Sequence, residues 1–282
     1  MVSLLKRIKD FDVRPKKRLG QHFLIDPQIL ERIALSADLE SDDIVIEVGA
    51  GAGGLTESLS KKARKIYAIE LDPHLINILE KQFSSNPIVE VVSGDALRFD
   101  FSSIHSSGQK RMKVVANLPY EISSPLIFRL LQEREHFSLF VLMLQSEVAN
   151  RLVARPGTKD YGILSLWCQL YTRPEIIFQV RPQAFFPMPK VESTVIKFEI
   201  LSQPSVEVAD EITWRKIIRS AFTYRRKTLA NAIHLGDFAH LPLTKICAII
   251  QSVGINPRSR GETLSLKEFR DLSQAFSGYT EQ

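Results

Sequence analysis

The chain has 282 residues, of which 44% are hydrophobic and 24% charged, an ordinary composition for a soluble globular protein with ample material for a core. Its net charge of +5 favours a polyanionic partner without proving one. The charged residues Lys6 and Arg7 interrupt the N-terminal segment before an apolar stretch develops. The longest apolar stretch of the chain, residues 137–144, is too short to cross a bilayer. We therefore expect a cytoplasmic protein with no signal peptide and no membrane partner.

The first part of the chain alternates short apolar runs with segments of helical periodicity. The runs are typical of buried parallel strands, at residues 44–48, 65–69, 88–92, 114–116 and 139–144. Helices are predicted between and around them, at residues 27–39 after the N-cap Asp26, 55–61, 73–83 after the N-cap Asp72, 124–131 and 147–154. This alternation predicts βαβ units, and hence an α/β fold whose parallel sheet carries helices on both faces.

The pattern changes in the second part of the chain. Strands are predicted at residues 175–180 and 191–200, on either side of a proline-rich loop, and helices follow at residues 212–222, 228–233, 243–253 and 266–276. We place a domain boundary near residue 203. The expected domains are residues 1–202, which begin with a basic segment at 1–25, and a small all-helical domain at 203–282.

A glycine-rich loop follows the first predicted strand. Gly49, Gly51 and Gly54 satisfy the pattern GxGxxG, and Glu70 ends the next strand 21 residues after Gly49. Glycines let the backbone approach a nucleotide cofactor, and a carboxylate at the second strand end can accept both ribose hydroxyls. The spacing fits NAD as well as S-adenosylmethionine, so the motif predicts a nucleoside cofactor without fixing the chemistry.

Two further acidic residues separate these cofactors. Glu47 stands just before the glycines, where it suits a cofactor carrying ammonium and sulfonium charge and would be unwelcome beside a pyrophosphate. Asp95 ends the third strand, where it can accept from the amino group of the cofactor's adenine. The structural alternative for each carboxylate is to cap a neighbouring helix. Three carboxylates at successive strand ends favour S-adenosylmethionine as the cofactor.

The tetrapeptide Asn117 to Tyr120 ends another apolar run. Ligands of open α/β sheets bind outside the carboxyl ends of the strands. The Asn117 amide oxygen and the Leu118 carbonyl, freed by Pro119, can accept the two hydrogens of an exocyclic amine while Tyr120 stacks on the ring. The alternative is an ordinary strand-terminating turn.

The cysteines and histidines argue against a metal site. Cys168 and Cys247 lie far apart among apolar neighbours, which indicates buried thiols in a reducing compartment. The six histidines are scattered without ligand spacing. We expect no metal cofactor.

Taken together, these motifs make the chain resemble the ribosomal RNA adenine dimethyltransferase family, in particular its bacterial small-subunit branch. The resemblance runs from Arg14 to about Phe269 and is carried by KRLGQHFL at 17–24, EVGAGAGGLT at 47–56, AIELD at 68–72, GDAL at 94–97, NLPYEIS at 117–123, QSEVANRL at 145–152 and FFPMPKV at 185–191. It implies a Rossmann-like class I methyltransferase sheet with a small all-helical C-terminal domain.

The resemblance also implies an activity. Members transfer methyl groups from S-adenosylmethionine to the N6 amines of two neighbouring adenines in a hairpin loop near the 3′ end of small-subunit rRNA. The products are N6,N6-dimethyladenines, formed during ribosome biogenesis, and S-adenosylhomocysteine. Carried over to this sequence, the cofactor contacts fall on His22, Leu24, Gly49, Glu70, Asp95 and Asn117. His22 replaces the commoner asparagine of the family pattern.

The target base must leave its stack for this chemistry. Tyr120 is expected on one face and Phe185 on the other, although core packing is the alternative for Phe185 because Phe186 beside it can equally point inward. Positioning matters more than a strong base, since the sulfonium is an excellent leaving group. We propose no general base.

Basic clusters at residues 14–18, 110–113, 151–159 and 225–227 predict an RNA-binding surface whose affinity falls with salt. The RNA-binding candidates are Lys17, Arg18, Arg151, Arg225, Arg226 and Lys227. The expected partner is small-subunit rRNA in a ribosomal subunit or its precursor, bound by a monomer. Two alternatives remain: a non-catalytic assembly or nucleic-acid-binding factor on the same fold, and an NAD-linked oxidoreductase, which Glu47 disfavours.

Overall fold

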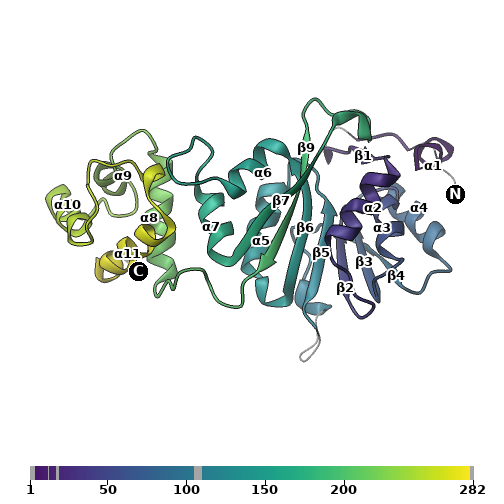
Figure 1. The fold of residues 1–282 in the computed structure, drawn as a ribbon, viewed down its shortest axis with the longest axis horizontal. Coiled ribbons are helices and arrows are strands. Elements are labelled where there is room, and N and C mark those ends of the chain that lie inside the picture. The colour runs from purple at the N-terminus through teal and green to yellow at the C-terminus, as the bar shows by residue number, and fades with distance from the viewer. Residues whose placement is uncertain (1–3, 12, 17–18, 105–109, 280–282) are drawn as a thin grey trace. The chain divides into compact units, whose positions relative to one another are not determined.

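The computed structural model describes residues 4–11, 13–16, 19–104 and 110–279 (Figure 1). Its described residues form two compact units, one within Met1–Ala149 and Arg173–Ile200, the other within Asn150–Thr172 and Leu201–Gln282. The sequence analysis placed the domain boundary near residue 203 and did not predict that residues 150–172 group with the C-terminal helices. Trp167 packs edge-on against Trp214, with ring centroids 5.3 Å apart, and this contact helps explain the grouping.

The first unit is built on a seven-stranded sheet with the order β4-β3-β2-β5-β6-β9-β7. The strands are β2 (Ile44–Val48), β3 (Lys65–Glu70), β4 (Val89–Ser93), β5 (Met112–Asn117), β6 (Phe137–Gln145), β7 (Thr172–Val180) and β9 (Ser193–Ile200). The strands from β4 to β6 are parallel, as predicted, and β9 runs antiparallel to β6. The α/β fold is therefore confirmed, with a mixed rather than a wholly parallel sheet.

The strand order places a switch point between β2 and β5. From β2 the chain builds outward through β3 and β4, and it then returns to β5 on the other side. Right-handed crossovers consequently put the helices after β2 and β3 on one face and the helix after β5 on the other. Ligands bind at such a point, outside the carboxyl ends of the strands.

The helices of the first part of the chain lie close to their predicted positions. They are α2 (Pro27–Ser36), α3 (Gly54–Leu59), α4 (Pro73–Phe83), α5 (Ser123–Gln132) and α6 (Ser146–Val153). Asp26 and Asp72 cap α2 and α4 through their side chains, and a proline opens each helix. A short helix, α1 (Leu4–Asp10), was not predicted; it buries Ile8, and its length of about two turns gives only a weak periodicity.

A small two-stranded pairing ties distant parts of the first unit together. Strand β1 (Phe23–Leu24) runs antiparallel to β8 (Phe185–Phe186), with Phe23 opposite Phe186 and Leu24 opposite Phe185. Two-residue strands carry no readable alternation, so the sequence did not predict this pair. It joins the N-terminal segment to the proline-rich loop.

The second unit is helical. Its helices are α7 (Ile163–Tyr171), α8 (Glu211–Thr223), α9 (Leu229–Leu235), α10 (Leu243–Ser252) and α11 (Leu266–Phe276). All but α7 were predicted. A helix that is apolar on most sides has no clear amphipathic stripe, and α7 buries Leu166, Trp167, Cys168, Leu170 and Tyr171.

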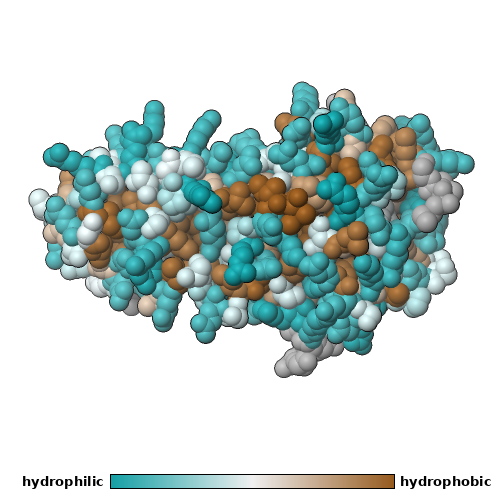
Figure 2. All heavy atoms as spheres, in the orientation of Figure 1, coloured by the Kyte–Doolittle hydropathy of each residue, from teal (hydrophilic) through white to brown (hydrophobic). Residues whose placement is uncertain are grey.

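The face drawn in Figure 2 is mostly hydrophilic, with hydrophobic atoms gathered over its middle, where Figure 1 shows β7. Ile176 and Ile177 of this edge strand are exposed. Pro174 on the same strand lacks an N–H, which is tolerated at a sheet edge. Among the described helices, none is long and apolar enough to span a membrane.

Candidate active site

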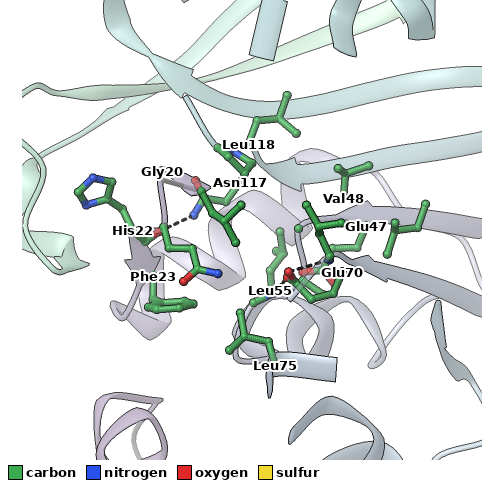
Figure 3. A pocket seen from close by; sticks show the side chains of 18 of the residues that line it. Gly20, His22, Phe23, Glu47, Val48, Leu55, Glu70, Leu75, Asn117 and Leu118 are labelled. Atoms are coloured by element: carbon green, nitrogen blue, oxygen red, sulfur yellow. Dashed lines mark hydrogen bonds between the residues drawn. The ribbon is translucent and has the colours of Figure 1, made fainter. Parts of the chain in front are cut away.

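A pocket opens at the carboxyl ends of β2, β3, β4 and β5, at the switch point of the sheet (Figure 3). Five segments line most of it: residues 19–24, 47–52, 69–71, 94–96 and 117–122. The pocket brings together all the predicted cofactor residues, which are His22, Leu24, Glu47, Gly49, Gly51, Glu70, Asp95 and Asn117. The rest of the tetrapeptide, Leu118, Pro119 and Tyr120, lines it as well. Residues far apart in the sequence thus share one cavity.

Gly49 and Gly51 are two of the loop glycines whose backbone lies in the left-handed region. Gly49 has φ of +71° and donates its N–H to the Ile69 carbonyl at 2.9 Å. Gly51 has φ of +59°, and a Cβ there would lie 3.3 Å from the Phe23 ring. Glycine adopts such backbone angles without strain, which is why it stands at both positions.

Glu70 holds this loop in place. Its Oε2 accepts the Gly51 N–H at 2.8 Å, and its Oε1 accepts the N–H groups of Leu71 and Asp72, each at 2.9 Å. Burial raises the pKa of Glu70, although these three hydrogen bonds favour the charged form. The carboxylate is therefore fixed in direction at the pocket wall, and one of its about four lone-pair positions, on Oε2, is left for a ligand.

Glu47 is the most unusual group in the pocket. It is 1% exposed, and its Oε2 has no hydrogen-bond partner among the described residues. Burial raises the pKa of Glu47 to about 8, and the neighbouring charge of Glu70 adds to the shift. A buried acceptor without a partner is costly. A cationic or hydrogen-bond-donating ligand that reached this oxygen would remove the cost.

Asp95 lies at the far strand end, partly exposed. Its Oδ1 accepts the Leu97 N–H at 2.9 Å. Arg129 of α5 holds the same loop, because its Nη1 donates to the Ala96 carbonyl at 3.0 Å. Its Nε forms an ion pair with Glu133 at 2.9 Å. The sequence analysis missed Arg129 because no local motif links α5 to the loop after β4.

Asn117 is oriented by a single hydrogen bond. Its Nδ2 donates to the backbone oxygen of His22 at 3.2 Å (Figure 3). Because that carbonyl can only accept, the amide nitrogen must face it, and the amide oxygen is directed elsewhere. Asn117 therefore keeps an acceptor for a ligand, as required by the predicted amine clamp, in which the Asn117 oxygen and the Leu118 carbonyl accept the two hydrogens of an exocyclic amine.

The side chain of Tyr120 is held at its hydroxyl and at one face of its ring. Its hydroxyl lies 3.2 Å from Oγ of Ser193, and its ring is stacked against the His22 ring with centroids 5.5 Å apart. Burial raises the pKa of Tyr120, so the phenol stays protonated at neutral pH. Ser193, at the start of β9, was another residue that the sequence analysis missed.

Phe185 does not reach the pocket. It is 4% exposed and belongs to the apolar core of the first unit, together with Leu24 and Met143. Its neighbour Phe186 is half-buried and is the more accessible ring. Alternate residues of a strand point to opposite faces, so only one of the two rings can face the core. The structure thus follows the core-packing alternative for Phe185.

The N-terminal segment is anchored beside the pocket by Asp72. Nζ of Lys16 lies 2.7 Å from Oδ1 of Asp72, and Nε2 of Gln21 lies 3.2 Å from Oδ2. Burial alone would raise the pKa of Asp72, but the hydrogen bonds from Lys16 and Gln21 outweigh it and the pKa lies below its usual value. Lys17 and Arg18 fall outside the described residues.

The remaining RNA-binding candidates lie in the second unit. Arg151, Arg226 and Lys227 are exposed. Arg225 is half-buried and used within the unit, because its Nε donates to Oε2 of Glu262 at 2.5 Å and its Nη2 to the Lys159 carbonyl at 2.6 Å. Arg225 therefore has a structural role that the sequence did not indicate.

The basic cluster at residues 110–113 is also largely engaged. Nζ of Lys110 lies within 3.0 Å of carboxylate oxygens of Glu40, Asp42 and Asp43, and Lys113 pairs with Asp43 at 2.8 Å. The carboxylate oxygens of these three acids lie close enough to one another to hold a cation. In the structure, the lysines neutralise it.

Comparison with known proteins agrees with this geometry. The model of the family "Ribosomal RNA adenine dimethylase" matches residues 13–272. The chain belongs to the ribosomal RNA adenine dimethylase family. It is an S-adenosylmethionine-dependent enzyme that dimethylates adenine in ribosomal RNA, which confirms the expected activity class.

Individual relatives cover nearly the whole enzyme. Ribosomal RNA small subunit methyltransferase A of Geobacter metallireducens is 46% identical over 93% of this chain and 96% of its own length. The protein of the same name from Clostridium perfringens is 43% identical over 96% and 94%. These relatives place the enzyme next to the small-subunit branch of the family.

Solved structures show the same fold. A dimethyladenosine transferase from Plasmodium falciparum superposes with a TM-score of 0.77 at 30% identity, covering 90% of this chain and 96% of its own. The 23S rRNA methyltransferase ErmE superposes with a TM-score of 0.67 at 25% identity, covering 90% and 99%. The likeness therefore extends over both units of the chain.

Proposed function

We propose that the enzyme dimethylates the N6 amines of two neighbouring adenines in a hairpin loop of small-subunit rRNA, during ribosome biogenesis. The observation that carries this proposal is the orientation of Asn117, whose oxygen remains available for an amine because its nitrogen is bound to His22. The names and coverage of the curated relatives support the small-subunit substrate. A non-catalytic factor would have no need for such an oriented acceptor.

The pocket residues fit S-adenosylmethionine. Glu47 offers a buried oxygen without a partner to a cationic ligand, Glu70 offers a fixed carboxylate to ribose hydroxyls, and Asp95 offers an acceptor to the adenine amine. His22, Leu24, Gly49 and Gly51 complete the proposed cofactor surface. The cofactor supplies the methyl group on a positively charged sulfur.

The chain's own residues prepare the nucleophile. An adenine amine is a poor nucleophile because its lone pair is delocalised into the ring. When Oδ1 of Asn117 and the Leu118 carbonyl accept its two hydrogens, the nitrogen can become pyramidal and direct its lone pair at the methyl carbon. Pro119 leaves the carbonyl accessible, and Tyr120 offers a ring for stacking, a contact of about 1–3 kcal/mol per base.

The proton leaves after methyl transfer rather than before it. Alkylation makes the amine hydrogen acidic, so water can take it from the product without a dedicated side-chain base. The enzyme's contribution is accordingly orientation of the amine in line with the departing sulfur. In a second cycle the monomethylated nitrogen has one hydrogen left, which one of the two acceptors takes, and its lone pair again faces the methyl carbon.

RNA is proposed to be held by exposed cations of the second unit, Arg151, Arg226 and Lys227, together with Lys17 and Arg18 of the N-terminal segment. Arg225 supports this surface through Glu262. Residues 1–202 would then carry the chemistry together with Lys17, Arg18 and Arg151, and residues 203–282 would add Arg226 and Lys227 to the RNA contact. We propose a monomer acting in the cytoplasm.

The decisive experiment is transfer of labelled methyl groups to small-subunit particles purified from cells that lack this modification. Nucleoside analysis of the rRNA should show two dimethyladenines per particle, and none with large-subunit particles. RNA affinity should fall with increasing salt, with a shallower slope for Arg226→Glu than for wild type. Transfer to large-subunit particles alone would contradict the proposal.

A further inference from the structure

Arg129 does not line the pocket, yet its side chain reaches the loop of residues 94–99, which carries Asp95. Its Nη1 donates to the Ala96 carbonyl at 3.0 Å, and its Nη2 donates to the Phe99 carbonyl. The side chain is 19% exposed, so these hydrogen bonds are largely shielded from water. The planar guanidinium spans two carbonyls of the loop and thereby fixes both of them at once.

The guanidinium of Arg129 is itself held in direction. One turn further along α5, Oε1 of Glu133 accepts the Nε hydrogen at 2.9 Å. The guanidinium carbon lies 5.1 Å from the centre of the Phe101 ring, which is fully buried. All three nitrogens of the side chain are therefore engaged, one with the carboxylate of its own helix and two with the loop. A lysine offers a single nitrogen and cannot reproduce this arrangement.

The loop of residues 94–99 is anchored at both of its ends. At its start, the Gly94 N–H donates to the Glu70 carbonyl at 3.0 Å, which ties it to β3. At its other end, Arg129 ties it to α5. Asp95 lies between the two anchors, and only its Oδ1 is used within the loop, on the Leu97 N–H. The place of its Oδ2 in the pocket therefore depends on both anchors.

Helix α5 links the second anchor to the base side of the pocket. The helix begins at Ser123, and the Oγ of this residue donates to the Tyr120 carbonyl at 2.9 Å. Arg129 follows less than about two turns later. The helix is fixed against the core by four buried side chains, those of Leu126, Ile127, Leu130 and Leu131. One helix thus holds both the tetrapeptide loop and the loop that carries Asp95.

We infer that Arg129 is a positioning residue that gives the cofactor pocket its preference for a purine with a 6-amino group. It acts through Asp95, because it holds the loop where the carboxylate can accept a hydrogen of that amine. Such a hydrogen bond weakens steeply when its angle or distance changes, so a small shift of the loop removes most of it. The inference rests on the proposed function, since it concerns how the same pocket recognises its cofactor.

The test compares two ligands that differ in this amine alone. One is S-adenosylhomocysteine, the reaction product, and the other is its 6-deamino analogue, in which a hydrogen replaces the amine. Both bind without turnover, so calorimetry gives their dissociation constants directly. Wild type should prefer the amino ligand about tenfold to hundredfold, the range for one hydrogen bond to a charged acceptor.

Arg129→Ala should lower this preference to less than about threefold, while affinity for the deamino analogue stays within about threefold of wild type. A loss confined to the amino ligand is the signature of positioning, because general damage to the pocket weakens both ligands. The KM for S-adenosylmethionine should rise about tenfold, with kcat at saturating cofactor within a few-fold of wild type.

Two further variants show that Arg129 acts through Asp95. Asp95→Ala should bind both ligands about equally, and adding Arg129→Ala to it should change the ratio of the two dissociation constants no further. Arg129→Lys keeps the charge and one hydrogen bond, so it should show an intermediate preference. Melting temperatures report whether each variant folds. If Arg129→Ala does not fold, Arg129→Lys carries the test, and a wild-type preference in it contradicts the inference.

Arg98 provides a matched control. It lies on the same loop, its side chain is 89% exposed, and its Nε is 4.0 Å from Oδ2 of Asp95. Arg98→Ala removes a positive charge near Asp95 but leaves both anchors in place, so the preference should stay within about twofold of wild type.

The inference is overturned if Arg129→Ala weakens both ligands equally or keeps the full preference. It is also overturned if Arg98→Ala loses the preference as completely, or if wild type has none. A wild-type enzyme that shows the preference but methylates no ribosomal particle would contradict the proposed function and leave the role of Arg129 intact.

Discussion

The two halves of the pocket lie at the ends of neighbouring strands but are held in different ways. In the cofactor half, Gly51 contacts Glu70, 19 residues further along the chain. In the base half, Asn117 is bound by His22, 95 residues away, and Tyr120 by Ser193, 73 residues away. The glycine loop and Glu70 thus come together within one βαβ unit, whereas the base half requires most of the first unit to be folded.

This difference has a consequence for mutations. A change in the glycine loop should act on cofactor affinity near the site of the change. A change in the base half should affect turnover, and distant residues such as Ser193 should reproduce it in part because they hold the same side chain.

The largest effect is expected for Asn117→Ala. Loss of the oriented acceptor should lower the rate of methyl transfer about 10²- to 10³-fold, as for other single polar groups that act on the reacting atoms. Cofactor affinity should fall much less than the rate, since Glu47 and Glu70 are untouched. Single-turnover transfer and calorimetric titration measure the two quantities separately.

Asn117→Asp makes the comparison sharper. It keeps two acceptor oxygens but cannot donate to the His22 carbonyl, so the orientation is lost while the acceptor is retained. A rate close to that of Asn117→Ala would assign the effect to orientation. Wild-type rates in either variant would contradict the amine clamp.

Phe185→Ala should act on stability rather than on the base. Removing a ring this deeply buried costs about 3–5 kcal/mol of unfolding free energy, measured by denaturant titration. Phe186→Ala, at a half-buried position on the opposite face, should cost less. If Phe185→Ala keeps its stability but loses turnover, the stacking role expected from the sequence is correct after all.

The same comparison explains what the sequence could predict. The strands β2 to β6 and the helices α2 to α6 follow from apolar periodicity and from caps such as Asp26 and Asp72, which are local signals. The pocket residues followed from motifs at strand ends. What could not be predicted depends on tertiary contacts: the β1–β8 pair, the anchoring of Tyr120 by Ser193, and the use of Arg225 within the second unit.

Glu70→Gln tests the cofactor half. An amide can accept at only one of its two atoms, so the N–H of Gly51 or those of Leu71 and Asp72 would lose a partner. Hydrogen bonds to charged groups contribute about 1.5–3 kcal/mol, which predicts cofactor affinity weakened about tenfold to hundredfold. Turnover at saturating cofactor should stay within a few-fold of wild type. Glu90→Gln, on the exposed neighbouring strand, is the control.

The smallest effect is a pH dependence that originates at Glu47. Its folded pKa of about 8 lies above the ordinary value of 4.5, so between these values the folded, ligand-free protein holds a proton that the unfolded chain has lost. The stabilising contribution is complete below about pH 4.5 and disappears as the pH rises through 8. The melting temperature of the free enzyme should therefore fall across this interval, and less so in Glu47→Gln.

A cationic cofactor reverses the preference, because it favours the ionised carboxylate. Cofactor affinity should consequently rise with pH up to about 8, by at most about tenfold per unit for one linked proton, with proton release visible as a buffer-dependent heat of binding. Glu47→Gln should bind more weakly and lose this dependence, whereas Glu80→Gln, at an exposed position of α4, should keep it. A cofactor affinity that is flat with pH in wild type would remove Glu47 from the cation-binding role, and leave the Asn117 half of the site untouched.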